Sequence, residues 1–171
     1  MNSNCGGRRR QPPGGGGRGR LPGWRAPRPT VRGMDPSSHD GRTNGTDLLA
    51  LMPFAALCGV ELQHADPDLV TGILPWAAER CTVGGMLHGA ALMALADTLG
   101  AACAFLNLPE GARTSTIESK TNFFRGVRAG AAHAQSRPLH VGRSTIVVQT
   151  DISDDEGRRV AQVTQTQSVL H

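Results

Sequence analysis

Asp97 is the residue whose type and surroundings most strongly suggest chemistry. It is the only Asp, Glu, Lys or Arg in a run over residues 83–105 that reads VGGMLHGAALMALADTLGAACAF. The side chains about one helical turn away are all apolar, namely Met93, Ala94, Ala101 and Ala104. An ionised carboxylate in such surroundings is costly unless something pairs with it or uses it. Asp97 is therefore either a buried carboxylate satisfied by Thr98 or a backbone amide, or a catalytic group.

The start of the same run is rich in glycine and could bind an anion. Gly84, Gly85 and Gly89 allow the backbone to approach a ligand closely. The first N–H groups of a helix have no partner within it and carry positive partial charge. Such amides can hold an oxyanion that forms on a carbonyl. One helix would then offer an oxyanion binder at its start and a carboxylate farther along.

Ala, Leu and Met dominate this run, which predicts a helix from about residue 86 to 105. Because the helix is apolar on every side, we expect it to be buried in the core of a domain. A shorter helix is expected over 48–57, capped by Thr46 and Asp47, interrupted at Pro53 and ended at Gly59.

Strand-like segments precede and follow the long helix. They cover residues 60–64, 69–74, 114–124, 131–141, 144–152 and 160–170. In the third segment, alternation places Ile117, Thr121 and Phe123 on one face, and Pro138 in the fourth indicates an edge or a bulge. Runs of strands after one buried helix indicate an α+β fold and not alternating βαβ units.

The helical segment resembles the PaaI-like branch of the hotdog-fold acyl-CoA thioesterases. The family's HGG…ADT pattern stands here as His88-Gly89-Ala90 followed by Ala96-Asp97-Thr98. The resemblance covers roughly residues 47–170 and implies an antiparallel sheet wrapped around one long central helix. It also implies that Asp97 is the catalytic carboxylate and that Gly89 supplies the oxyanion amide. His88 would shape the turn or contact the carbonyl region.

Three positions depart from the family's pattern. Ala90 replaces the second Gly of HGG. Thr82 stands six residues before the His, where the family often has an Asn or Gln that contacts the thioester carbonyl. Ala101 stands four residues after the carboxylate, where Ser or Thr is frequent. The resemblance therefore preserves the carboxylate and the amide, while the side chains that assist them differ.

The resemblance also implies where the substrate binds. Thr82 and Gly85 lie in the loop expected beside the thioester, and the strands with their loops supply the site for the CoA phosphates. Arg side chains suit phosphate because the guanidinium binds two oxygens at once. The candidate residues are Asn122, Arg125, Arg143 and Ser144. The alternative is that Arg125 and Arg143 are solvated arginines at strand ends.

The activity implied is hydrolysis of an acyl- or aroyl-CoA thioester to the free acid and CoA. Asp97 would act either as the general base for water or as the nucleophile, which gives a mixed anhydride. No cofactor is expected beyond the CoA of the substrate, and no metal site is indicated by the cysteine and histidine spacing. The alternatives are a non-catalytic acyl-CoA binding protein and a hotdog hydratase or dehydratase.

Helix geometry predicts a homodimer with shared active sites. Gly89 and Asp97 are eight residues apart, so they lie about 12 Å apart along the helix axis. An Asp side chain cannot span that distance, so both groups can meet one carbonyl only if two chains contribute. The expected arrangement is an antiparallel pair of helices in a twofold dimer, and two dimers could pair further.

The first 45 residues differ from the rest in composition. They are dominated by Gly, Arg, Pro and Ser, and all eight arginines before residue 34 occur without an acidic residue. Such a segment predicts a disordered leader followed by one domain over 46–171. A chain that begins at Met34 is expected to keep its activity. Nucleic-acid binding and a membrane span are not expected, and the cytoplasm is the expected location.

Overall fold

The computed structural model describes residues 45–171, and the side chains from residue 48 onward. The leader predicted over residues 1–45 lies outside the described part, apart from Gly45, so that interpretation stays a prediction. The boundary between the leader and the domain likewise stays a prediction.

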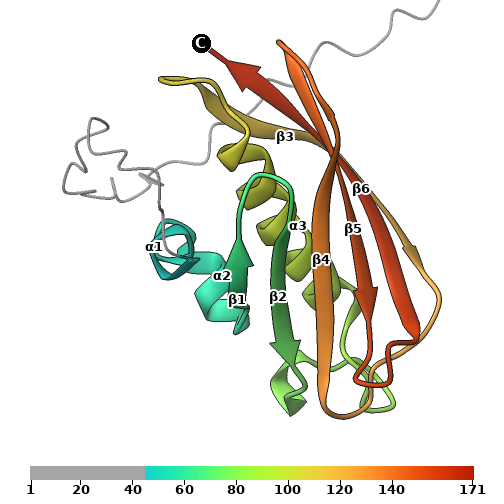
Figure 1. The fold of residues 1–171 in the computed structure, drawn as a ribbon. Coiled ribbons are helices and arrows are strands. Elements are labelled where there is room, and N and C mark those ends of the chain that lie inside the picture. Colours follow the sequence, from blue (N-terminus) through green and yellow to red (C-terminus); the bar gives the residue numbers. More distant parts are fainter. Residues whose placement is uncertain (1–44) are drawn as a thin grey trace, which may run out of the picture. The chain divides into compact units, whose positions relative to one another are not determined.

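One antiparallel sheet of six strands forms most of the described domain (Figure 1). The strands run in the spatial order β1-β2-β4-β5-β6-β3. Their bounds are β1 Glu61–Ala65, β2 Val70–Pro75, β3 Arg113–Phe123, β4 Ala131–Val141, β5 Thr145–Ser153 and β6 Arg159–Leu170. Each predicted strand is present within one residue at either end, and β1 and β3 form the two edges of the sheet.

Between residues 45 and 171, three α-helices and one short 3-10 helix accompany the sheet: α1 Gly45–Ala50, α2 Pro53–Cys58, η1 Ala78–Arg80 and α3 Gly89–Leu106. The first predicted helix does restart at Pro53, and it ends at Gly59 in the left-handed conformation. The long helix begins at Gly89 and not at residue 86. Gly84 and Gly85 both have positive φ, which turns the chain immediately before the helix.

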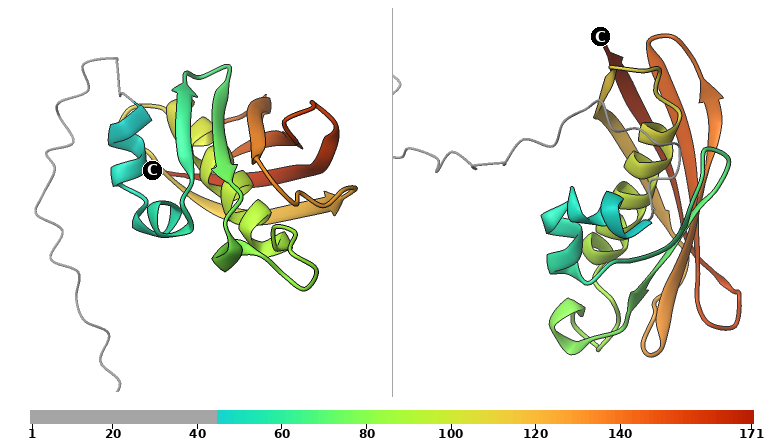
Figure 2. Two further views of the ribbon diagram at one scale, coloured as in Figure 1. Left: turned by 90° about the horizontal axis from the view of Figure 1, so that it is seen from below. Right: turned by 60° about the vertical axis from the view of Figure 1, so that its left-hand side comes forward.

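The sheet curls around α3, which lies across its inner face (Figure 1 and, from two further directions, Figure 2). Leu95, Leu99 and Cys103 of α3 are fully buried against this face. Most inner side chains of the strands are small or β-branched, and include Val70, Ala134, Ile146, Val148, Ile152 and Val163. This arrangement is the hotdog architecture that the sequence predicted, an α+β fold with a central helix.

The expectation that α3 is buried on every side is wrong. Ala90, Met93 and Asp97 are exposed, and Ala94 and Ala101 are only half-buried. These five residues form one stripe along the helix, which we call the open face of α3. In length and mean hydropathy α3 could also cross a membrane, but half of it is buried inside the fold.

Two bulges alter the predicted strand patterns. The register between β4 and β5 shifts between Pro138 and His140, so Pro138 stands beside a bulge. The pairing of β4 with β2 ends at Ser136, so Pro138 also lies where β5 is the partner strand of β4 and β2 no longer is. The edge or bulge expected at Pro138 is confirmed. The register between β3 and β6 shifts between Thr116 and Glu118. Ile117 is the extra residue there and is 62% exposed. The bulge interrupts the alternation that the sequence had suggested for the whole of this strand.

Candidate active site

Asp97 lies on the open face of α3, and a neighbouring strand holds its carboxylate. Gln165 of β6 donates a hydrogen bond from Nε2 to Asp97 Oδ1 at 2.5 Å. Thr98, the partner considered from the sequence, instead donates its hydroxyl proton to the carbonyl of Ala94. Thr116 of β3 gives this carboxylate a second hydrogen bond. Because Asp97 is exposed on the open face, the carboxylate is still accessible for chemistry.

Two opposing effects set the pKa of Asp97. Burial by the surrounding helix and sheet raises the pKa above the ordinary value of 3.8, while hydrogen bonds with Thr116 and Gln165 lower it. Burial is the largest of these effects, although the side chain is exposed in the single chain. A partly desolvated carboxylate is, in its ionised form, suited to accept a proton or to attack a carbonyl.

The start of α3 has the features expected of an oxyanion site. His88 is the N-cap residue, and its Nδ1 accepts a hydrogen bond from the N–H of Ala90 at 2.9 Å. The N–H groups of Ala91 and Leu92 both bond to the His88 carbonyl. Within residues 45–171 the N–H of Gly89 has no hydrogen-bond partner. His88 thus shapes the turn, and Gly89 presents a free donor at the positive end of the helix.

Removing the His88 cap is expected to cost stability. A lost N-cap destabilises a protein by about 1 kcal/mol, so His88→Ala should lower the free energy of unfolding by that amount. His88→Asn is the matched control, because asparagine is also a favoured N-cap. Urea denaturation of both variants measures the difference. Equal losses in the two variants would show that the cap is not what His88 contributes.

A shallow hollow beside the helix start brings several predicted site residues together, and we call it the Gly89 hollow. Its lining residues are Thr82, Met86, Leu87, Gly89, Leu92, Phe123, Phe124, Arg125 and Gly126. Three of these, Thr82, Gly89 and Arg125, were candidates from the sequence. The Phe123 ring lies so close that a Cβ on Gly89 would meet it at 3.2 Å. Gly89 therefore lines a hollow that also includes two aromatic side chains and one arginine.

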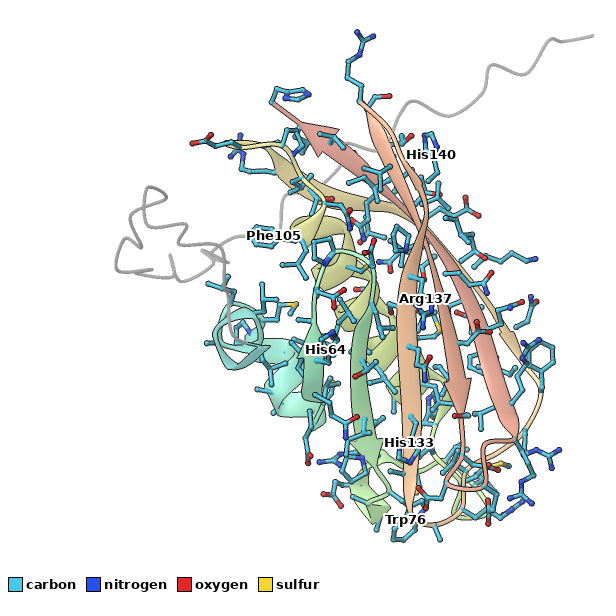
Figure 3. All side chains as sticks on the ribbon, viewed as in Figure 1. His64, Trp76, Phe105, His133, Arg137 and His140 are labelled. Carbon is cyan, nitrogen blue, oxygen red and sulfur yellow. The ribbon has the colours of Figure 1, made fainter. Side chains whose placement is uncertain are left out.

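The loop before α3 fixes the positions of Thr82 and Gly85. The N–H of Thr82 donates to the Met86 carbonyl, and the N–H of Gly85 donates to the Thr82 carbonyl. The indole of Trp76 donates to the Gly85 carbonyl at 2.9 Å. Figure 3 shows Trp76 at the end of the sheet where β2 leads into this loop. The N–H and the carbonyl of Gly85 are therefore both hydrogen-bonded. Gly85 stabilises the loop and does not present a free N–H to a substrate.

A second hollow lies on the other side of the helix start, between α2 and α3. It is lined by Phe54, Leu57, Cys58, Glu79, Arg80, Cys81, His88, Ala90, Ala91 and Ala94. Cys81 donates its thiol proton to the carbonyl of Ala77 at 3.2 Å, which ties the end of η1 together. Asp97 lines neither hollow. Within one chain, the carboxylate of Asp97 and the amide of Gly89 therefore do not belong to the same hollow.

Within one chain, the candidate phosphate-binding residues lie far apart. The N–H of Arg125 bonds to the Val160 carbonyl at the start of β6, whereas Ser144 accepts from the N–H of Val169 near the end of β6. Nine residues of extended strand span about 30 Å. Arg143 and Ser144 therefore lie at the opposite end of the sheet from Asn122 and Arg125. These four residues cannot form one phosphate site within a chain.

Gln165 and Thr116 are site residues that sequence reasoning missed. Gln165 and Gln167 occupy inward positions of β6 between Val163 and Val169, and both are fully buried. Period-2 alternation through the run VTQTQSV places two amides on the apolar face, and such groups need partners. That alternation was the signal available in the sequence. In the described part of the chain no three His, Cys, Asp or Glu side chains gather as metal ligands.

Comparisons with known proteins relate this chain to thioesterases. A sequence profile of the thioesterase superfamily matches residues 84–161. A proofreading thioesterase, EntH, of Cronobacter turicensis is 32% identical over 101 residues, which cover 59% of this chain and 74% of that protein. The 1,4-dihydroxy-2-naphthoyl-CoA hydrolase of Escherichia coli is 26% identical over 111 residues, covering 65% and 82%. A crystal structure of a mutant thioesterase from Pseudomonas aeruginosa superposes with a TM-score of 0.72 and 26% identity, covering 77% of this chain and 96% of that one.

Proposed function

Because this chain belongs to the thioesterase superfamily and has the hotdog fold, we propose that it hydrolyses an acyl- or aroyl-CoA thioester to the free acid and CoA. The observation that carries the proposal is the free N–H of Gly89 at the start of the helix whose open face also carries Asp97. The name of the Escherichia coli relative, a CoA hydrolase, supports CoA as the thiol.

In the proposed reaction the thioester carbonyl lies in the Gly89 hollow. The negative charge that develops on its oxygen accepts a hydrogen bond from the Gly89 N–H, in the positive field of the helix start. The carboxylate of Asp97 either takes a proton from the attacking water or attacks the carbonyl itself. In the first route the proton taken from water passes to the sulfur as the C–S bond breaks, and CoA leaves as the thiol. In the second route the C–S bond breaks to give a mixed anhydride; water then hydrolyses this anhydride, which releases the free acid, restores Asp97 and supplies the proton of the CoA thiol. No bound cofactor takes part.

The proposed enzyme is a homodimer, because one chain cannot bring Gly89 and Asp97 to one carbonyl, and two such dimers could pair further. The open face of α3 includes exposed Met93, and the edge strand β3 beside it exposes Ile117 and Phe123. Apolar side chains around a carboxylate suit burial against a second copy. An antiparallel partner helix would bring its Asp97 to the Gly89 of the first chain. Arg143 and Ser144 would then serve a phosphate site together with residues of another chain.

A panel of acyl-CoA substrates tests the proposed activity. The full chain is incubated with short, long and aromatic acyl-CoAs, and released CoA is measured with a thiol reagent. Each substrate is paired with its N-acetylcysteamine thioester, which keeps the acyl group and lacks the nucleotide. Preference for the CoA form supports phosphate binding by Arg125 and Arg143. No hydrolysis of any thioester would contradict the proposal.

The cytoplasmic location expected from the sequence stays a prediction.

The pH dependence of the reaction follows from the pKa of Asp97. Both proposed roles need the ionised carboxylate, so kcat/KM should fall on the acid side as Asp97 takes up a proton. Because burial raises this pKa, the midpoint should lie above the ordinary value of 3.8. Rates between pH 3.5 and about 8, corrected for unfolding, measure it. A midpoint below the ordinary pKa of an Asp side chain would contradict the statement that burial has the largest effect on the pKa of Asp97.

A further inference from the structure

Gln165 occupies an unusual position for an amide. Its side chain crosses the apolar interface between β6 and α3 and is fully buried. Nε2 donates to Asp97 Oδ1 at 2.5 Å and also approaches Thr116 Oγ1 at 3.2 Å. Its other end, Oε1, is buried and accepts no hydrogen bond within the described chain. A buried carbonyl oxygen without a hydrogen-bond partner lowers the stability of the fold. An apolar side chain at position 165 would avoid this cost, so the amide must have another role.

Gly100 makes this placement possible. It lies three residues after Asp97 and so stands next to it on the helix. A Cβ at Gly100 would lie 2.0 Å from Gln165 Oε1 and 3.1 Å from Gln165 Cδ. Any other residue at position 100 would therefore displace the amide. Glycine inside a helix is less stable than alanine. The helix is therefore destabilised at the position where the amide of Gln165 packs against it.

Thr116 completes the arrangement around the carboxylate. Its hydroxyl oxygen accepts from Nε2 of Gln165 and, at 2.9 Å, from Nε2 of Gln167. A hydroxyl has two acceptor sites and one proton, so both acceptor sites are used and the proton remains for Asp97. Burial raises the pKa of Asp97, and the only opposing causes are hydrogen bonds with Thr116 and Gln165. No charged side chain of the described residues is among those causes.

We propose that Gln165 is a positioning residue for the catalytic carboxylate, and that Gly100 is glycine to admit it. Gln165 fixes Oδ1 by a hydrogen bond, which orients the carboxylate for the reaction. The same bond favours the ionised form of a carboxylate that the fold partly desolvates. Gln165 itself contacts no substrate, and it acts through the orientation and ionisation of Asp97. This role rests on the proposed function of Asp97.

Two matched substitutions of buried glutamines test the proposal. Gln165→Met keeps the length of the side chain and removes its donor. Gln167→Met makes the same change two residues along β6, where the amide bonds to Thr116 and Thr114 but not to Asp97. Both variants lose a buried polar side chain, so a general effect on packing should appear in both. Only Gln165→Met should change Asp97.

The first readout is the titration of the Asp97 carboxyl carbon, followed by NMR in the full-length protein. Gln165→Met should move this titration to higher pH, and Gln167→Met should leave it in place. The second readout is steady-state kinetics on a CoA thioester that the wild type hydrolyses. Gln165→Met should lower kcat on the order of tenfold, the scale of a lost hydrogen bond to a charged group. KM should change little, and the acid limb of kcat/KM should follow the NMR titration.

Gly100→Ala gives an independent test that keeps the amide. The new methyl group should displace Gln165 from Asp97 and move the Asp97 titration in the same direction as Gln165→Met. This variant also serves if Gln165→Met does not fold. An unchanged Asp97 titration in Gln165→Met or Gly100→Ala, or an equal shift in Gln167→Met, would overturn the proposal. Because the NMR titration needs no substrate, these outcomes are distinct from a failure of the proposed thioesterase activity.

Discussion

Asp97→Asn is expected to lower turnover on the order of a hundredfold or more, the usual scale for losing a catalytic acid–base group. Asparagine neither accepts a proton from water at neutral pH nor attacks a carbonyl as a carboxylate does. Substrate binding should change little, because the proposed contacts to the carbonyl and to CoA lie elsewhere, at Gly89, Arg125 and Arg143. The measurement is kcat and KM on the best acyl-CoA of the panel.

The fold should tolerate this substitution. Burial raises the pKa of Asp97 in the folded chain, so the folded state binds a proton more readily than the unfolded state does. The ionised carboxylate therefore lowers stability as the pH rises through this pKa, and protonation at lower pH restores it. Asparagine carries no charge and its side-chain oxygen can still accept from Gln165. At neutral pH Asp97→Asn should melt at a temperature no lower than that of the wild type.

The control for this prediction is Asp151→Asn. Asp151 lies on β5 and accepts hydrogen bonds from Gln149 and Gln162, away from the open face of α3. This variant should keep wild-type turnover. A well-folded Asp97→Asn protein that hydrolyses its substrate at the wild-type rate would remove Asp97 from the mechanism. That result would favour another group as the base, and it would leave the open face of α3 as a surface that binds another molecule without taking part in the reaction.

The sequence predicted the fold well because its elements carry strong local signals. The alternation of β5 and β6 and the run of α3, which is rich in Ala, Leu and Met, each identify one element type. The pattern of exposure along α3 could not be predicted, because Ala90, Ala94 and Ala101 are as apolar as the buried positions of the same helix. Only the three-dimensional arrangement shows that the sheet covers one side of the helix and leaves the other open.

The candidate site was predicted in part, and the limits have physical causes. His88 and Gly89 stand next to each other, so their roles at the helix start follow from local geometry. Gln165 is 68 residues from Asp97, and only the register of β6 beneath α3 brings them together. The separation of Arg125 from Arg143 depends in the same way on the antiparallel order of β3, β6 and β5.

Mixing two inactive variants should restore activity if the sites are shared between chains. The variants are Asp97→Asn, which lacks the carboxylate, and Gly89→Pro, which lacks the oxyanion N–H. Proline suits the first position of a helix, and the residue before proline must be extended. His88 already has φ −63° and ψ 141°, which suits a following proline. A Cβ at position 89 would lie 3.2 Å from the Phe123 ring, so this ring must shift slightly. Gly89→Pro should therefore remove one donor and keep the helix.

Each mixed dimer should contain one site with both native groups and one site with neither. If the chains associate at random, about half of them pair as mixed dimers, so about a quarter of wild-type activity should return after the two proteins are unfolded and refolded together. Each variant refolded alone is the control and should stay inactive. Native mass spectrometry establishes that mixed dimers have formed. If they have formed and no activity returns, the carboxylate and the amide act within one chain. The distance of about 12 Å along α3 would then have to be bridged by a change in the helix itself.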